Sequence, residues 1–147
     1  PDTYVEADIN LPLYNGDLEE AEGVPAAVQT LADQIAAADA VIISTPEYNK
    51  AISGSLKNAL DWVSRTKGGP WNGKPVAIMS AAAGRAGGER AQFSLRLAMM
   101  AFRPDILQGP EVLLANSSNE FDDAGHLKVE IYIKMLTELM DALKARV

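Results

Sequence analysis

The sequence predicts one α/β domain whose parallel sheet is covered by helices on both faces. Three observations support this. Two continuous apolar runs, Ala40–Ser44 and Val76–Ser80, are typical of strands buried on both faces of a parallel sheet. Segments with apolar residues at helical spacing alternate with these runs. The length of 147 residues, 48% of them hydrophobic, suits a single domain spanning residues 1–147.

The first expected element is a half-buried strand over Tyr4–Ile9, where apolar and polar residues alternate. Turn residues over Leu11–Gly16 end it. Pro25 then begins a helix, because its missing N–H costs little at a first helical position. One face of this helix carries apolar residues at helical spacing, namely Val28, Leu31, Ala32 and Ile35.

The Ala40–Ser44 strand leaves in an extended conformation, because Pro46 disfavours helix at Thr45. After a loop, Ser53 is the expected N-cap of the next helix. The buried face of that helix consists of Leu56, Ala59, Leu60 and Val63. Lys67–Pro75 holds three glycines and two prolines and is an expected surface connection to the Val76–Ser80 strand.

The C-terminal half continues the alternation of helix and strand. A helix is expected over Glu89–Phe102, a short strand over Val112–Ala115 and a polar loop over Asn116–His126. The last helix, Lys128–Arg146, has an expected inward face of Val129, Ile133, Leu136, Met140 and Leu143.

Composition excludes several classes of function. The formal net charge is −7 with no cluster of Lys and Arg, which disfavours binding to nucleic acid or to a membrane surface. No apolar run approaches the ~20 residues that a membrane helix needs. Without cysteine the chain can form no disulfide, thiolate nucleophile or cysteine metal site, and we expect a cytoplasmic location. His126, the only histidine, lies in a polar loop, so a surface role is expected for it.

Ligands of open α/β sheets bind beyond the carboxyl ends of the strands. This rule selects two segments, Thr45–Ser53 and Ala81–Gly88. Each leads into the start of a helix, where free N–H groups and the helix dipole favour negative charge.

The segment TPEYNKAISGSLKNALDWVSR, Thr45 to Arg65, resembles the signature of the NADPH-dependent FMN reductase family, which includes quinone, azo-dye and chromate reductases. The chain is also similar to that family at Leu11–Asn15, at Trp71–Pro75 and at Gly87-Gly88 with Arg90. The resemblance covers nearly the whole chain. It implies a flavodoxin-like, doubly wound three-layer fold with strand order 2-1-3-4-5.

The resemblance also implies an FMN site. Its first loop would line the isoalloxazine ring with Thr45, Pro46, Glu47, Tyr48 and Asn49. Its second loop would contribute Ala82, Ala83, Gly84, Arg85 and Gly87. The alternative for the first loop is a surface β-turn with an incidental tyrosine. Arg85 would contact the flavin edge or a nicotinamide phosphate, and the alternative is a solvated loop arginine. The glycine spacing is not the G-x-G-x-x-G dinucleotide fingerprint.

By this resemblance the chain passes a hydride from NADPH or NADH to FMN and then passes electrons to a quinone, a flavin or a similar small acceptor. The cofactor supplies the chemistry, so we expect no catalytic side chain and no metal. An alternative is a flavodoxin-type electron carrier with protein partners, which would not oxidise NAD(P)H with a small quinone. A third possibility is a domain that keeps the fold without FMN.

Two further expectations concern oligomerisation and residues upstream of this sequence. A homodimer or homotetramer is expected, with Trp62 of the Gly54–Ser64 helix in an exposed patch, and the alternative places Trp62 in the core of its own chain. The resemblance implies that this helix and the Glu89–Phe102 helix pack against the partner, with the flavin near their contact. If Tyr4–Ile9 is the second strand of the sheet, the central first strand and the family's G-S-x-R-x-x-S-x-N phosphate loop have no match here. We therefore expect about 30–40 residues upstream, the size of one β-α unit. The alternative pairs Tyr4–Ile9 directly with Ala40–Ser44.

Overall fold

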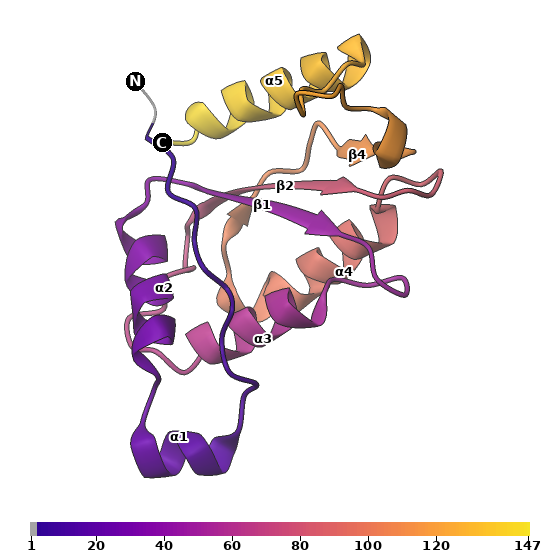
Figure 1. The fold of residues 1–147 in the computed structure, drawn as a ribbon. Coiled ribbons are helices and arrows are strands. Elements are labelled where there is room, and N and C mark those ends of the chain that lie inside the picture. Colours follow the sequence, from indigo (N-terminus) through magenta and orange to yellow (C-terminus); the bar gives the residue numbers. More distant parts are fainter. Residues whose placement is uncertain (1–2) are drawn as a thin grey trace.

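The computed structural model describes residues 3–147, which form a parallel sheet between two layers of helices (Figure 1). Its strands are β1 (Val41–Pro46), β2 (Pro75–Ala81), β3 (Asp105–Ile106) and β4 (Val112–Leu114). β1 pairs over its whole length with one edge of β2, in parallel. β3 pairs with the start of β2 and β4 with its end, so these two short strands act as one interrupted neighbour.

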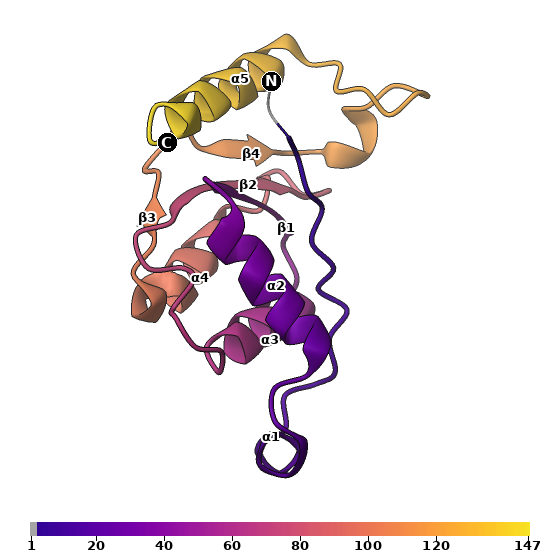
Figure 2. The same ribbon diagram turned by 90° about the vertical axis from the view of Figure 1, so that its left-hand side faces the viewer.

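Within residues 3–147, five α-helices accompany the sheet: α1 (Gly16–Glu22), α2 (Ala26–Ala37), α3 (Gly54–Val63), α4 (Glu89–Met99) and α5 (Glu130–Lys144). Short 3-10 turns occupy Met100–Phe102 and Ser117–Asn119. Figures 1 and 2 show α2, α3 and α4 on one face of the sheet and α5 on the other, which confirms the doubly wound α/β prediction. None of the helices in the described part of the chain has the length and apolar character needed to cross a bilayer.

Each face of the sheet has its own apolar core. The larger core joins β1 and β2 to α2, α3 and α4 and includes Leu31, Ile43, Leu60, Ile78, Leu95 and Met99. The smaller core lies under α5 and includes Ala77, Leu107, Val112, Leu139 and Leu143. β2 is buried on both faces, and this explains its continuous apolar run in the sequence.

Local signals in the sequence place several elements correctly. Pro25 is the N-cap of α2, and the four apolar residues expected on its inner face are all buried. Ser53 is the N-cap of α3, and its Oγ accepts a hydrogen bond from the N–H of Leu56 at 3.2 Å. Pro25, which makes no capping hydrogen bond and lies one position before the first helical residue, marks the start of α2, and the Ser53 cap marks that of α3.

The expected strand over Tyr4–Ile9 is wrong. These residues form an irregular and mainly exposed segment that runs along the β1 side of the molecule (Figures 1 and 2). The alternative, direct pairing with β1, is also not observed, because within residues 3–147 the only partner of β1 is β2. A strand needs a neighbour for its backbone N–H and C=O groups, and the alternation of side chains does not supply one. The prediction of an upstream strand and helix stays untested.

The expected exposed patch at Trp62 is also wrong, since this side chain is 0% exposed. Its Nε1 donates to the carbonyl oxygen of Pro12 at 2.7 Å, and its ring meets the ring of Tyr14 edge-on with centroids 4.9 Å apart. Asn58 also donates to the Pro12 carbonyl oxygen and accepts from the N–H of Tyr14. α3 thus uses its own Trp62 to hold the N-terminal segment, and the alternative reading of this residue is confirmed.

α1 was not expected as a helix. It begins after Asn15, whose side chain accepts from the N–H groups of Asp17 and Leu18. Its Glu19 forms an ion pair with Arg65 at 2.9 Å. Hydrogen bonding to Arg65, and then to the Tyr14 hydroxyl, lowers the pKa of Glu19 below its usual value. These contacts fasten α1 to the end of α3.

The expected inner face of α5 is partly wrong. Leu143 is buried as expected, but Leu139 is also buried at 1% exposure, whereas Ile133 is 44% exposed. Apolar residues lie at adjacent positions, 131–133, 135–136 and 139–140, so two neighbouring faces of the helix fit the pattern, and packing against the sheet selects the one that contains Leu139. β3 is a further element that the sequence did not predict, because two residues carry no readable periodicity.

Candidate functional site

The strands β1, β2 and β4 end level at their carboxyl ends. Pro46 is paired with Ala81, and Ala81 is paired with Leu114. The two segments predicted to bind a ligand therefore leave the sheet side by side. We call Pro46–Ile52 the first edge loop and Ala82–Gly88 the second edge loop.

The first edge loop turns sharply at its tip. Tyr48 and Ala51 exchange two backbone hydrogen bonds, each 3.0 Å long, around Asn49 and Lys50. These two residues have φ angles of 51° and 71°. Asparagine tolerates positive φ, but the same conformation costs a lysine about 1–2 kcal/mol. The turn holds Tyr48 outward, with 62% of its side chain exposed.

The other residues of this segment have different surroundings. Thr45 is buried at the end of β1, and its hydroxyl donates to the carbonyl oxygen of Pro46. Oε2 of Glu47 accepts from the backbone N–H groups of Arg90 at 3.1 Å and of Ala91 at 3.3 Å, in the first turn of α4. Thr45 and Glu47 support the loop, whereas Tyr48 and Asn49 are exposed at its tip.

The second edge loop is tied to the segment that follows β4. The N–H of Ala82 donates to the carbonyl oxygen of Leu114 at 3.0 Å, and the N–H of Ser117 donates to that of Ala82 at 3.1 Å. The carbonyl oxygen of Gly84 accepts from the N–H of Asn116 at 3.3 Å. These bonds hold the exposed residues of the loop, Ala83, Gly84 and Arg85, on a fixed base.

A buried polar network fixes the end of the second edge loop. The hydroxyl of Ser80 donates to the carbonyl oxygen of Gly87 at 2.7 Å. The amide nitrogen of Gln92 donates to the Ser80 hydroxyl at 3.0 Å and to the carbonyl oxygen of Val112 at 2.9 Å. Gly87 itself lies so close to Leu113 that a Cβ would be 2.4 Å from the Leu113 carbonyl group. The loop thus requires glycine at this position and is held in one conformation.

Sequence reasoning missed two parts of this edge, namely the segment 115–117 and the buried Gln92. The first could have been found, because the predicted Val112–Ala115 strand also ends at the carboxyl edge of the sheet. Gln92 carries no comparable signal, since a glutamine within an amphipathic helix is usually on the solvent face.

The exposed residues of the two loops fit a flat ring. At Gly84 a Cβ would meet nothing within 4 Å, and Ala82 and Ala83 are small. Tyr48 offers an exposed aromatic side chain on the neighbouring loop. Small residues on one loop and an exposed aromatic side chain on the neighbouring loop are residue types that suit contact with a flat ring.

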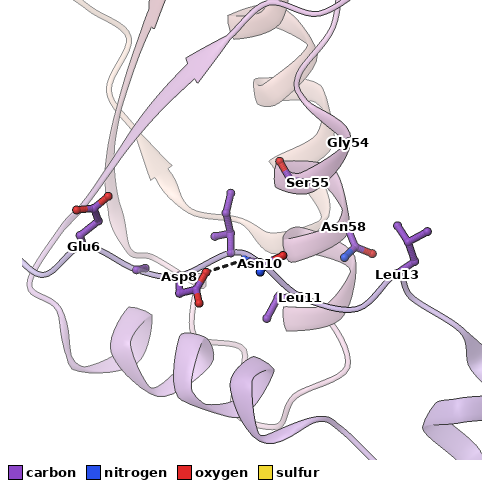
Figure 3. Close-up of a pocket in the computed structure, with 10 residues that line it drawn as sticks. Glu6, Asp8, Asn10, Leu11, Leu13, Gly54, Ser55 and Asn58 are labelled. Carbon is purple, nitrogen blue, oxygen red and sulfur yellow. Dashed lines mark hydrogen bonds between the residues drawn. The ribbon is translucent and has the colours of Figure 1, made fainter.

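A separate cavity of about 890 Å³ lies between the N-terminal segment and the start of α3 (Figure 3). Glu6 and Asp8 line one side of it, and Ser55 and Asn58 of α3 line the other. None of the ten predicted site residues lines it. The described residues that line it include two carboxylates and no Lys or Arg, which disfavours a phosphate group there. The residue types of the two edge loops are therefore compatible with a flat ring, whereas this cavity is unsuited to a phosphate group.

Comparisons with known proteins agree with this geometry. Residues 4–119 match the family model described as NADPH-dependent FMN reductase. The chain is 43% identical to an NAD(P)H-dependent FMN reductase of Pseudomonas aeruginosa over 139 residues, which covers 94% of this chain and 75% of the relative. It is 42% identical to a quinone reductase of Escherichia coli over 113 residues, 77% of this chain and 60% of the relative. The chain thus spans less than two thirds of that quinone reductase.

The fold is similar to that of a solved flavoenzyme, the NAD(P)H:(acceptor) oxidoreductase FerB of Paracoccus denitrificans. The TM-score is 0.82 at 34% identity, over 93% of this chain and 75% of that one. The sheet, the two edge loops and the family match lead to one conclusion. The chain belongs to the NADPH-dependent FMN reductase family.

Proposed function

We propose that the two edge loops bind the isoalloxazine ring of FMN, which takes a hydride from NADPH or NADH and passes electrons to a quinone, a flavin or a similar small acceptor. The observation that carries the proposal is the adjacency of the loops at one edge of the sheet. β1 and β2 end in register, and Glu47 bridges the first edge loop to α4, which directly follows the second. The names of the relatives, FMN reductase and quinone reductase, support the same reaction.

The chain's residues bind and orient, and FMN supplies the redox chemistry when bound. Tyr48 and Asn49 would contact the ring from the first edge loop, with Pro46 behind them. Ala82, Ala83 and Gly84 would approach it through the backbone, because small side chains leave room. Arg85 is exposed and would contact the ring edge or a nicotinamide phosphate. The buried Thr45 and Gly87 would support the two walls rather than touch the ring.

The test replaces Glu47, Tyr48 and Asn49 together by alanine. FMN affinity should fall at least about tenfold, or about 1.4 kcal/mol. The matched control is Lys67→Ala, which removes a charged side chain from the surface connection Lys67–Pro75. Visible spectra before and after anaerobic NADPH addition would follow flavin reduction. An unchanged titration curve for the triple variant would refute the assignment of the first edge loop, and failure to oxidise NAD(P)H with a small quinone would favour an electron carrier.

The proposal includes a homodimer or homotetramer formed through α4 rather than through Trp62. Phe93, Leu97 and Met100 lie at i, i+4 and i+7, and their side chains are 56%, 71% and 71% exposed. Three large apolar side chains on one helical face would be unfavourable in contact with water. A second copy of the chain would cover them, close to the first edge loop that Glu47 ties to the same helix.

Light scattering tests this interface with Leu97→Glu. The variant should be monomeric at micromolar concentration, where the unmodified protein is not. Ile131→Glu is the control, because Ile131 is also exposed, at 57%, but lies on α5. A monomeric unmodified protein would refute the proposal.

We also propose a cytoplasmic location, supported by the absence of cysteine from the sequence. Cell fractionation would test it.

A further inference from the structure

Helix α4 begins at a position that cannot hold a capping side chain. Its N-cap residue is Gly88, with φ of 89°. A Cβ at this position would lie 2.7 Å from the Cβ and 2.8 Å from the hydroxyl of Ser80. The serine, threonine, aspartate or asparagine that usually accepts from the first N–H groups of a helix is therefore excluded.

The missing acceptor comes from another segment of the chain. Oε2 of Glu47, which is 43 residues earlier than Arg90 in the sequence, accepts from the N–H groups of Arg90 and Ala91. These are the second and third residues of α4, and their N–H groups are the ones that an N-cap side chain normally serves. The carboxylate also places negative charge at the positive end of the helix dipole.

We propose that Glu47 is a positioning residue of the flavin site, which uses α4 as an anchor to set the spacing between the two edge loops. This inference rests on the proposed function. The carboxylate faces α4, and its loop neighbours Tyr48 and Asn49 remain exposed. The second edge loop is held by its own network, and Glu47 adds a connection from the first edge loop, beyond the pairing of Pro46 with Ala81, to the helix that follows the second.

The geometry identifies a conservative replacement. Both hydrogen bonds end on the same oxygen of Glu47, so one carbonyl oxygen is enough to accept them. Glu47→Gln keeps such an oxygen and loses the charge, whereas Glu47→Ala loses the acceptor. Glu89→Ala is the matched control, because it removes an acidic side chain from the same first turn and leaves the bridge between loop and helix intact.

The experiment measures two quantities in the full protein. Without FMN, amide hydrogen exchange at Arg90 and Ala91 should become about fivefold faster in Glu47→Ala, because losing a helix cap typically costs about 1 kcal/mol. The exchange rates of Glu47→Gln and Glu89→Ala should stay near that of the unmodified protein. In FMN titrations, the Kd of Glu47→Ala should rise about fivefold or more, while that of Glu47→Gln should rise less than about twofold.

Each other outcome has a defined meaning. Faster exchange in Glu47→Ala with an unchanged FMN Kd would show that Glu47 only caps the helix, and would overturn the positioning role. A Glu47→Gln protein that binds FMN as weakly as Glu47→Ala would show that the charge acts on the flavin directly, which also overturns it. If the unmodified protein does not bind FMN, the proposed function fails and this inference fails with it.

Discussion

The two edge loops lie side by side, but the protein holds them in opposite ways. The second edge loop is fixed from below by buried hydrogen bonds of Ser80 and Gln92 and by the contact of Gly87 with Leu113. The first edge loop is held by the carboxylate of Glu47, which binds the start of α4, and by its own tight turn, in which Lys50 has a φ of 71°.

This difference indicates a division of roles. A loop held by buried hydrogen bonds resists displacement, because moving it leaves their donors and acceptors unpaired. A loop held by half-exposed contacts and a strained turn opens at lower free energy. We infer that the second edge loop is the fixed wall of the proposed site, whereas the first is the less firmly held wall, whose spacing from the other is set by Glu47.

Gly87→Ala should have the largest effect on stability, because an alanine side chain cannot be accommodated in the close contact between Gly87 and Leu113 that holds the fixed wall. The new Cβ would lie 2.4 Å from the Leu113 backbone, at a φ of 59°. Overpacking and positive φ together should lower the free energy of unfolding by about 3 kcal/mol, measured by urea denaturation.

Gly84→Ala is the matched control for that change. It lies in the same loop but in open space, so a change within about 0.5 kcal/mol is expected. Equal losses in the two variants would contradict the assignment of the fixed wall to the Gly87 contact.

Ser80→Ala should have an intermediate effect. It leaves the carbonyl oxygen of Gly87 without its donor and removes one acceptor of Gln92, at a site that is 2% exposed. Unfolding free energy should fall by about 2 kcal/mol. Ser44→Ala, on the exposed side of β1, should change the free energy of unfolding by less than about 0.5 kcal/mol. A loss as large as that of Ser80→Ala would show that the buried network does not stabilise the protein more than an ordinary surface serine does.

Lys50→Gly should have the smallest effect and the opposite sign. Relief of positive φ, worth about 1–2 kcal/mol, is largely offset by the roughly 0.5–1 kcal/mol entropy cost of glycine. We expect a gain of about 0.5 kcal/mol in urea denaturation. Asn49→Gly is the comparison, and its gain should be smaller because asparagine tolerates this conformation. Destabilisation by Lys50→Gly would show that the turn is not strained.

Much of the fold could be predicted from the sequence because its signals are local. The apolar runs of β1 and β2, the buried face of α2 and the Ser53 cap of α3 depend on residues within a few positions of one another. The placement of the two edge loops also followed, since parallel strands bring their carboxyl ends to one edge. The family signature supplied the cofactor, which the physical pattern alone did not identify.

Tertiary structure decided what depends on distant neighbours. Alternation in Tyr4–Ile9 was a valid strand pattern, but only a paired neighbour turns such a pattern into a strand. Trp62 could be exposed or buried by its sequence, and Pro12, 50 residues away, decided that it is buried.

Glu47 shows the same division within the site. The resemblance to the family predicted that Glu47 lines the flavin. Only the structure shows that its carboxylate accepts a hydrogen bond from α4, 43 residues further along the chain. The sequence by itself determined the buried face of α2, the Ser53 cap of α3 and the edge of the sheet where a ligand is proposed to bind. These features depend on short-range spacing and on the rule that relates parallel strands to their carboxyl ends. Only the tertiary structure decided the long-range hydrogen-bond partners, such as Pro12 for Trp62 and the start of α4 for Glu47. These residues are more than 40 positions apart, and local sequence patterns do not indicate which distant segments meet when a long loop closes.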